Sequence, residues 1–230
     1  MKIAIIPARG GSKRIPRKNI KDFNGKPIIA YSIEAALASG CFDKVIVSTD
    51  DDEIAAVAVS YGAAVPFIRP SELSDDYATT AAVIEHALKY FESEGYSVKY
   101  LCCIYPTAPL ISSNDISRSF RELEESNAHF CFPVCSFAYP IQRALKLNQE
   151  NRVQMFQPEH LNTRSQDLEE GYHDTGLFYW GRAESFLDGI PVFSEQSIPY
   201  LIPRYRVIDI DNPEDWDIAL KLFSAFKEVN

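Results

Sequence analysis

The chain has 230 residues, of which 46% are hydrophobic, and it carries a formal net charge of -9. This size and apolar content suffice for one α/β core, and the acidic balance argues against binding to nucleic acid or to an anionic membrane. No apolar run approaches the roughly 20 residues of a membrane span. The five cysteines lie mostly in apolar segments, so we expect a reduced, cytoplasmic protein.

The first element is a buried strand over residues 3–6, and it leads directly into a basic loop. A continuous apolar run is typical of a central strand in a parallel sheet. Seven of the 23 basic residues lie between positions 9 and 26, beside one acidic residue, so the rest of the chain has 16 basic and 31 acidic residues. A positive loop on so negative a body attracts a compact polyanion. Because open α/β sheets bind ligands where strands end, we predict a nucleoside triphosphate here.

The loop reads Ala-Arg-Gly-Gly-Ser-Lys-Arg-Ile-Pro-Arg-Lys-Asn over residues 8–19. It contains neither the dinucleotide-binding nor the P-loop glycine pattern. It resembles the amino-terminal motif of the cytidylyltransferases that activate acidic nine-carbon sugars, the CMP-sialic acid synthetase group, and later segments extend the resemblance over nearly the whole chain. The resemblance implies that CTP binds here, with Arg9, Lys13 and Lys18 as catalytic residues. It also implies that the nucleotide contacts Ala8, Gly10, Gly11, Ser12 and Asn19.

Helical periodicity over residues 28–37 and a strand over residues 44–48 follow the loop. The acidic run over residues 50–53 invites a metal-binding interpretation. We favour helix capping, because acidic residues stabilise a helix amino end and apolar periodicity continues after Ile54. Residues 64–68 are predicted as a further short strand.

Residues 69–80 resemble the family segment that binds the base and ribose of the nucleotide, with Arg69, Asp76 and Thr80 at matching places. A loop with an arginine, a carboxylate and hydroxyls can form hydrogen bonds with a base edge and a ribose. The segment also suits a capped helix start, with Thr79 or Asp76 as the cap. Both interpretations can hold together.

A strand over residues 100–104 precedes a turn with two prolines, residues 105–111. CMP-sialate synthetases usually have Gln and Arg where this chain has Tyr105 and Ile111. The departure disfavours sialic acid and favours a more apolar sugar such as pseudaminic acid. The resemblance places Tyr105 and Thr107 at the sugar.

A helix over residues 115–126 and a strand over 129–134 precede an irregular stretch, residues 136–171. Such a stretch is long for a plain loop. In the family a comparable arm crosses to a second subunit and closes its sugar site, which implies a homodimer. Either Arg143 or Arg164 is expected to hold the sugar carboxylate, because a guanidinium fork matches that group.

Residues 172–181, Tyr-His-Asp-Thr-Gly-Leu-Phe-Tyr-Trp-Gly, are similar to the family branch that acts on pseudaminic acid. The aromatic run can form the wall of a sugar site, and Gly176 permits close backbone approach. The resemblance assigns Asp174, Gly176 and Phe178 to sugar binding. A hydrolase is disfavoured, because no nucleophile motif accompanies the His-Asp pair.

Asp209 and Asp211 lie two residues apart in a predicted strand, which would place both carboxylates on one face. Paired carboxylates suit Mg²⁺, or alternatively Mn²⁺, together with substrate phosphates. Capping of the last helix, residues 214–226, is the structural alternative. Asn212 and Pro213 already provide that cap.

These segments predict a three-layer Rossmann-like, mostly parallel α/β sheet of the nucleotide-diphospho-sugar transferase type. We expect one domain over residues 1–230, with residues 136–171 as an inserted dimerisation arm. The implied reaction transfers CMP from CTP to the anomeric hydroxyl of an acidic α-keto sugar, a nonulosonic acid best matched by pseudaminic acid, and releases pyrophosphate. Sialic or legionaminic acid is the alternative sugar. An Asp-x-Asp glycosyltransferase and a non-catalytic nucleotide sensor are the alternatives from other classes.

Overall fold

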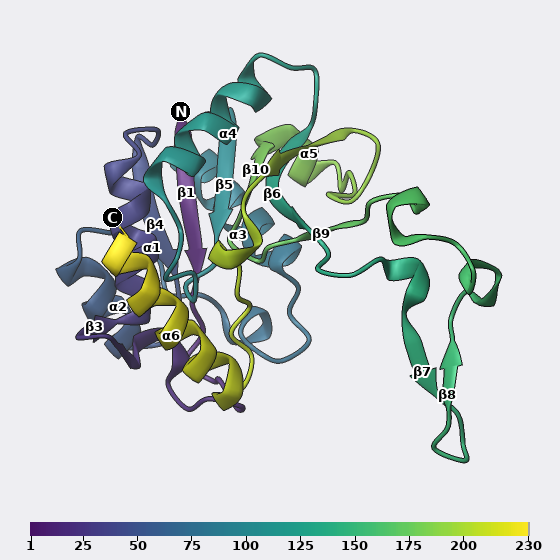
Figure 1. The fold of residues 1–230 in the computed structure, drawn as a ribbon. Helices are drawn as coiled ribbons and strands as arrows, with labels where there is room; N and C mark the ends of the chain where they lie inside the picture. Colours follow the sequence, from purple (N-terminus) through teal and green to yellow (C-terminus); the bar gives the residue numbers. More distant parts are fainter. Residues whose placement is uncertain (230) are drawn as a thin grey trace.

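The computed structural model describes residues 1–229 and is built on a seven-stranded sheet (Figure 1) in the order β11-β6-β10-β5-β1-β4, with β9 beside β6. The strands are β1 (Lys2–Pro7), β4 (Lys44–Ser48), β5 (Tyr100–Ile104), β6 (Phe130–Ser136), β9 (Tyr172–Asp174), β10 (Phe178–Arg182) and β11 (Ser197–Leu201). β10 runs antiparallel to β5 and β6, and β9 runs antiparallel to β6. The other pairs are parallel, so the predicted mostly parallel α/β sheet is confirmed.

Helices cover both faces of this sheet, as the side chains of β1 require. The helices are α1 (Ile28–Ala38), α2 (Asp52–Ser60), α3 (Thr80–Ser93), α4 (Ser113–Glu124), α5 (Ala183–Leu187) and α6 (Pro213–Val229). Because successive strand residues point to opposite faces, Ala4 and Ile6 pack in the cluster that includes α1 and α4, whereas Ile3 and Ile5 pack against α3. This gives the three predicted layers. Among the described residues, no helix has the length and apolar character needed to cross a membrane.

The predicted helix caps are present. The Asp51 carboxylate accepts a hydrogen bond from the N–H of Ile54 (2.9 Å) at the start of α2. Thr79 caps α3, and the Asn212 side chain accepts from the N–H of Glu214 (2.9 Å) at α6. Each cap satisfies a backbone donor that the first helical turn leaves without a partner.

Two predicted strands are wrong. Residues 64–68 form only isolated bridges at Ala64 and Ile68, because Pro66 lies between them and has no N–H for a ladder bond. Residues 207–211 follow a 3₁₀ turn (Arg204–Arg206) and take part in no strand pair within the described chain. The shared direction of Asp209 and Asp211 therefore cannot be argued from strand alternation.

The segment between β6 and β9 leaves the body and extends away from it (Figure 1). It carries a small hairpin, β7 (Leu145–Leu147) and β8 (Val153–Met155), and three 3₁₀ turns. Large apolar side chains are exposed along it, namely Phe137, Tyr139, Ile141, Leu145, Leu147, Val153, Phe156 and Leu161. We call residues 137–171 the arm.

The order in which the strands are added to the sheet reverses at β1. The chain passes from β1 through α1 to β4 on one side, and later returns to β5 on the other side of β1. In open α/β sheets such a switch point leaves a crevice at the carboxyl ends of the strands, where ligands bind. A minor hairpin, β2 (Asp22–Phe23) with β3 (Lys26–Pro27), closes the basic loop that follows β1.

Candidate active site

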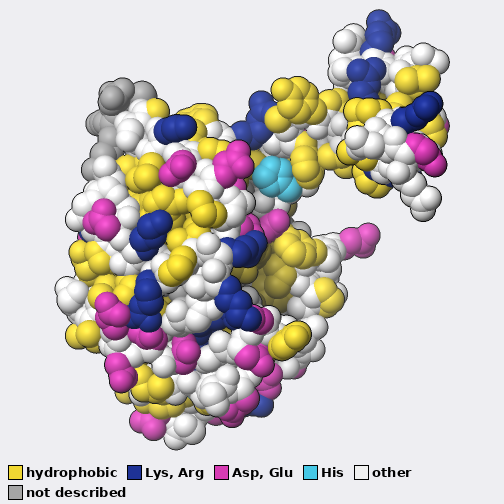
Figure 2. All heavy atoms as spheres, turned by 90° about the horizontal axis from the view of Figure 1, so that it is seen from below, with side chains coloured by type: hydrophobic (Ala, Val, Ile, Leu, Met, Phe, Trp, Pro, Cys, Tyr) yellow, Lys and Arg dark blue, Asp and Glu magenta, His cyan; other side chains and the backbone are white. Residues whose placement is uncertain are grey.

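A cavity of about 530 Å³ opens at the carboxyl end of β1. Figure 2 shows Lys and Arg side chains gathered on the face seen from below, toward which β1 points in Figure 1. The cavity brings together ten residues predicted from the sequence: Arg9, Ser12, Lys13, Lys18, Asn19, Asp76, Tyr105, Thr107, Asp209 and Asp211. They come from four separate segments of the chain.

The basic loop is anchored to the acidic run after β4. Gly10 donates its N–H to Asp50 Oδ1 (3.0 Å), and a Cβ on Gly10 would lie 2.7 Å from Asp51 Oδ2. Arg17 has a positive φ of 54° and forms a bidentate pair with Asp51 (2.5 and 2.9 Å). The acidic run therefore both caps α2 and holds the loop, which extends the capping prediction. A Cβ on Gly11 would meet no heavy atom within 4 Å, so the backbone there is open to a ligand.

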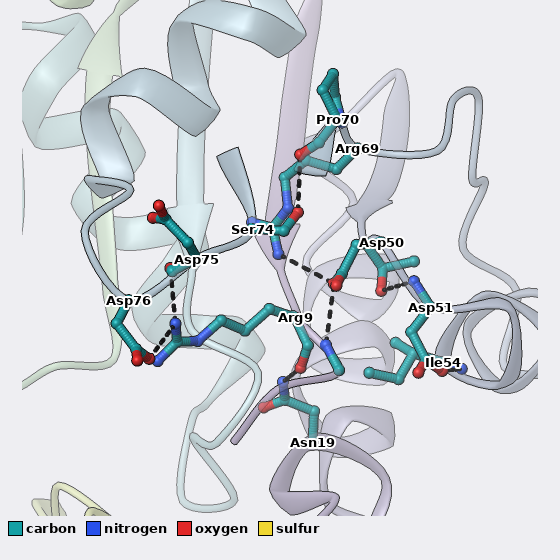
Figure 3. Close-up of polar contacts among 12 residues, drawn as sticks. Arg9, Asn19, Asp50, Asp51, Ile54, Arg69, Pro70, Ser74, Asp75 and Asp76 are labelled. Carbon is teal, nitrogen blue, oxygen red and sulfur yellow. Dashed lines mark hydrogen bonds and ion pairs between the residues drawn. The ribbon is translucent and has the colours of Figure 1, made fainter. Parts of the chain in front are cut away.

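The loop cations have carboxylate partners inside the cavity. Arg9 Nη1 contacts Asp76 Oδ1 (2.9 Å) and donates to the carbonyl of Asp75 (2.7 Å) (Figure 3). Lys13 also pairs with Asp76, and this hydrogen bond is the main cause of the lowered pKa of Asp76. A triphosphate would compete with Asp76 for the same two cations.

The carboxylates of Asp209 and Asp211 face the loop from the other side. Burial raises the pKa of Asp209, and the neighbouring charge of Asp211 raises it further. Burial lowers the pKa of Lys18, against the attraction of Asp211. Arg14 Nη2 contacts Asp211 Oδ1 at 2.8 Å, and Lys18 Nζ donates to the carbonyl of Ile210 at 2.6 Å.

These two carboxylates fit a divalent cation. After burial, the charge of Asp211 is the next largest cause of the raised pKa of Asp209, and a divalent cation would offset that repulsion between the two carboxylates. No group of three Asp, Glu, His or Cys ligands occurs in residues 1–229. Mg²⁺ characteristically binds one or two carboxylates and completes its shell with water and substrate phosphates, so a two-carboxylate site suffices for it.

A second cavity, of about 380 Å³, adjoins the first and shares Arg9, Asp76, Tyr105 and Asp211 with it. Thr80 lines its wall together with Arg69, which is only 5% exposed. The Arg69 backbone N–H donates to the carbonyl of Thr49 at the end of β4 (2.7 Å). Its Nε and Nη2 atoms have no hydrogen-bond acceptor among the described residues.

A third, apolar cavity of about 350 Å³ lies beyond Tyr105 and Thr80, which line it too. Tyr179 donates its hydroxyl to Asp174, and burial raises the pKa of Tyr179. The remaining walls are mainly apolar and include Ile84, Phe186, Ile190, Pro191, Val192 and Phe193. Asp174 and Gly176 also approach the carboxylate pair, because a Cβ on Gly176 would lie 3.7 Å from Asp209 Cγ and the charge of Asp174 acts on Asp209.

Several predicted site residues lie elsewhere. Phe178 is 1% exposed and packs in the core, because it points to the opposite face of β10 from Tyr179. Ala8 is fully buried, and its N–H donates to the carbonyl of Ser48. Arg143 and Arg164 lie on the arm, where they contact Thr163 and Asp167, and neither lines the three cavities of the body.

Sequence reasoning missed Arg14 and Tyr179, which line these cavities, and Asp50, which contacts the basic loop. Arg14 belongs to the basic loop, and its charge was the available signal. Tyr179 follows Phe178, and strand alternation could have separated the inward ring from the cavity ring. Asp50 was interpreted only as part of a helix cap. Its contact with Gly10 joins residues 40 positions apart, for which the sequence carries no local signal.

The sheet, the cationic loop after its first strand and the opposing carboxylates together define the class of nucleotidyltransferases. Residues 3–210 match the family model described as cytidylyltransferase. The chain is 46% identical over 226 residues to the pseudaminic acid cytidylyltransferase of Campylobacter jejuni, covering 98% of this chain and 97% of that protein. It is 30% identical to the CMP-N,N'-diacetyllegionaminic acid synthase of Legionella pneumophila, covering 99% and 98%. The chain belongs to the cytidylyltransferase family.

A solved structure of CMP:2-keto-3-deoxy-manno-octonic acid synthetase complexed with CTP has the same fold. Its TM-score is 0.68 at 16% identity, and the match covers 97% of this chain and 98% of that one. A 4-diphosphocytidyl-2C-methyl-D-erythritol synthase from Anaerococcus prevotii matches with a TM-score of 0.61 at 13% identity, covering 97% and 98%. The predicted fold is thereby confirmed.

Proposed function

We propose that this cytidylyltransferase transfers CMP from CTP to the anomeric hydroxyl of pseudaminic acid and releases pyrophosphate. The observation that carries the proposal is one continuous site. Its cationic cavity, with Lys13 on one side and Asp209 on the other, adjoins the Arg69 cavity and, across Tyr105, the apolar cavity. The 46% identity to a pseudaminic acid enzyme over almost the full length supports the sugar assignment.

In this proposal the chain acts mainly by positioning and by cationic stabilisation. Arg9, Lys13 and Lys18 bind the triphosphate and stabilise the charge that develops on its oxygens as the sugar hydroxyl attacks the α-phosphorus. Ser12 and Asn19 line the cavity proposed for these phosphates, and the open backbone at Gly11 leaves room for them. Phosphoryl transfer needs no covalent enzyme intermediate.

Asp209 and Asp211 are the proposed ligands of Mg²⁺ or Mn²⁺. When bound, such an ion neutralises phosphate charge and acidifies a coordinated hydroxyl. Lys18 lies beside both carboxylates and holds the backbone of Ile210 between them. The chain thus fixes the positions of both carboxylates relative to the loop.

The apolar cavity is the proposed place for the acyl and methyl groups of the sugar. Tyr105, Tyr179 and Phe193 provide aromatic walls there, which suit weakly polar substituents. Asp174 and Thr107 offer hydrogen-bonding groups close to the sugar ring. Those walls support an N-acylated deoxy sugar over a more hydroxylated one.

The arm is the proposed dimer contact. Its exposed apolar side chains are typical of an interaction surface, and a second copy of the chain would cover them. We propose that the partner's arm brings Arg143 or Arg164 to the sugar carboxylate, because the arm extends away from its own body (Figure 1) and neither residue lines a cavity of that body.

Pyrophosphate release tests the function. CTP, UTP, ATP and GTP are each combined with pseudaminic, legionaminic, sialic and Kdo sugars in the presence of Mg²⁺. Of the four nucleotides, we expect only CTP to release pyrophosphate, and we expect the largest kcat/KM with pseudaminic acid. A larger kcat/KM with legionaminic acid would reassign the sugar. Release of a nucleoside diphosphate from a nucleotide sugar would instead indicate a glycosyltransferase.

A further inference from the structure

Asp50 lies between Arg69 and the basic loop, which we also call the phosphate loop (Figure 3). Its Oδ1 atom accepts the N–H of Gly10 at 3.0 Å and lies 3.7 Å from Arg69 Nη2. Asp50 directly follows β4 and Thr49, whose carbonyl holds the backbone of Arg69. One carboxylate oxygen therefore contacts two segments that are about 60 residues apart in the chain.

Asp50 is the ionic partner of the Arg69 side chain. Its guanidinium is almost entirely buried, and two of its nitrogens have no hydrogen-bond acceptor. Burial lowers the pKa of Arg69, Asp50 opposes that effect, and the charge of Arg9 adds to it. Since Asp50 is the only carboxylate paired with Arg69 in the described chain, its loss would leave this buried guanidinium without a charge that opposes the repulsion from Arg9.

The Arg69 guanidinium, which lines this cavity, matches one pyrimidine better than the other. A guanidinium presents donors side by side and has no acceptor. The cytosine edge offers two acceptors, O2 and N3, whereas uracil has an N3–H donor in place of the second. A guanidinium held in place at the cavity wall can thus donate to both O2 and N3 of cytosine. With uracil, one of its N–H groups would face the N3–H group of the base, and this mismatch is a strong basis for discrimination.

We propose that Asp50 is a positioning residue for the choice of cytosine over uracil. It holds the Arg69 guanidinium toward the base and, through Gly10, fixes the phosphate loop at a set distance from the base cavity. The inference rests on the proposed use of CTP. It adds a residue that acts through Arg69 and the loop and does not itself contact the reacting atoms.

Calorimetric titration with CTP and with UTP, without any sugar, tests the inference. Asp50→Asn keeps an oxygen that can accept the Gly10 N–H but removes the charge that orients Arg69. Arg69→Lys removes the fork and keeps the charge. The control is Asp52→Asn, which removes an equal charge from an exposed neighbour at the start of α2. Asp50→Glu, which keeps the charge and moves it by one methylene, is the second variant at the same position.

We expect Asp50→Asn and Arg69→Lys each to lower the CTP-to-UTP affinity ratio about tenfold, with the control unchanged and Asp50→Glu in between. When Asp50→Asn and Arg69→Lys are combined, the second change should lower the affinity ratio by less than a further twofold, because both changes remove the same contact. The ratio is taken within one variant, so a smaller folded fraction affects both nucleotides equally.

An unchanged ratio in Asp50→Asn, additive losses, or no preference for CTP in the parent protein would overturn the inference. If pyrophosphate release fails with every sugar while these ratios change as expected, the proposed reaction is wrong and the positioning role stands.

Discussion

Arg17→Ala should loosen the phosphate loop and destabilise the protein in a pH-dependent way. Arg17 pairs bidentately with Asp51 and also contacts Glu53. This pairing is the main reason that the pKa of Asp51 falls from 3.8 to about 2. The full fall corresponds to at most about 2.4 kcal/mol. The backbone N–H groups of Ile54 and Glu53 share it, and solvent reaches 39% of the Arg17 side chain and 21% of that of Asp51.

After these reductions we expect Arg17→Ala to cost about 1 kcal/mol at pH 7. A lowered carboxyl pKa stabilises the fold above the unfolded value of 3.8 and ceases to do so as the pH falls toward 2. About half of the effect should therefore be lost at pH 3. Because Asp51 also touches the Gly10 position, the variant should raise the KM for CTP as well.

Urea unfolding at pH 7 and at pH 3 measures the effect. Lys89→Ala is the control, because Lys89 forms an exposed ion pair with Glu85 on α3, and removing it should cost about 0.5 kcal/mol or less. The reasoning would be refuted if Arg17→Ala cost no more than the control, or if its cost were the same at both pH values. An unchanged KM for CTP would show that the Arg17–Asp51 pair stabilises the fold without affecting how the loop binds the nucleotide.

Three further predictions concern the catalytic site and the arm. Lys13→Ala should lower kcat by about 10²-fold or more, since it removes a cation from developing charge; near-normal pyrophosphate release would contradict its assignment. Asp209→Asn should abolish most of the Mg²⁺-dependent rate while leaving CTP binding within about threefold; an unchanged metal titration would place the ion elsewhere. Leu147→Asp with Phe156→Asp should convert a dimer into monomers, because it places charge on exposed apolar positions of the arm. A monomeric parent protein in light scattering at micromolar concentration would refute the dimer.

Much of the fold could be predicted because its signals are local. The apolar run at β1, the periodicity of α3 and the capping residues at α2 and α6 each lie within a few residues of the element they specify. Where two local signals conflicted, the prediction failed. Residues 64–68 look like a strand by composition, yet Pro66 prevents a continuous ladder.

The candidate site was predicted residue by residue through motif resemblance, but its contacts were not. Phe178 and Tyr179 are adjacent aromatics, and the side of β10 that each faces depends on which helices cover the sheet. Arg143 and Arg164 were assigned to the sugar from the sequence, whereas in the structure both lie on the arm and neither lines the cavity of its own subunit. Strand alternation places the two rings on opposite faces, but residue type and spacing decide neither which face borders the cavity nor where the arm arginines lie.

The amino-acid sequence alone determined the parallel sheet, the position of the cationic loop after its first strand and the kinship with cytidylyltransferases, because period, capping and motif are properties of neighbouring residues. Only the tertiary structure decided that Asp76 and Asp211 pair with the loop cations, that Asp50 connects Gly10 to Arg69, and that an apolar cavity borders Tyr105. Those arrangements join residues that lie 19 to 197 positions apart. Their geometry is set by packing at the switch point of the sheet, where distant strand ends meet.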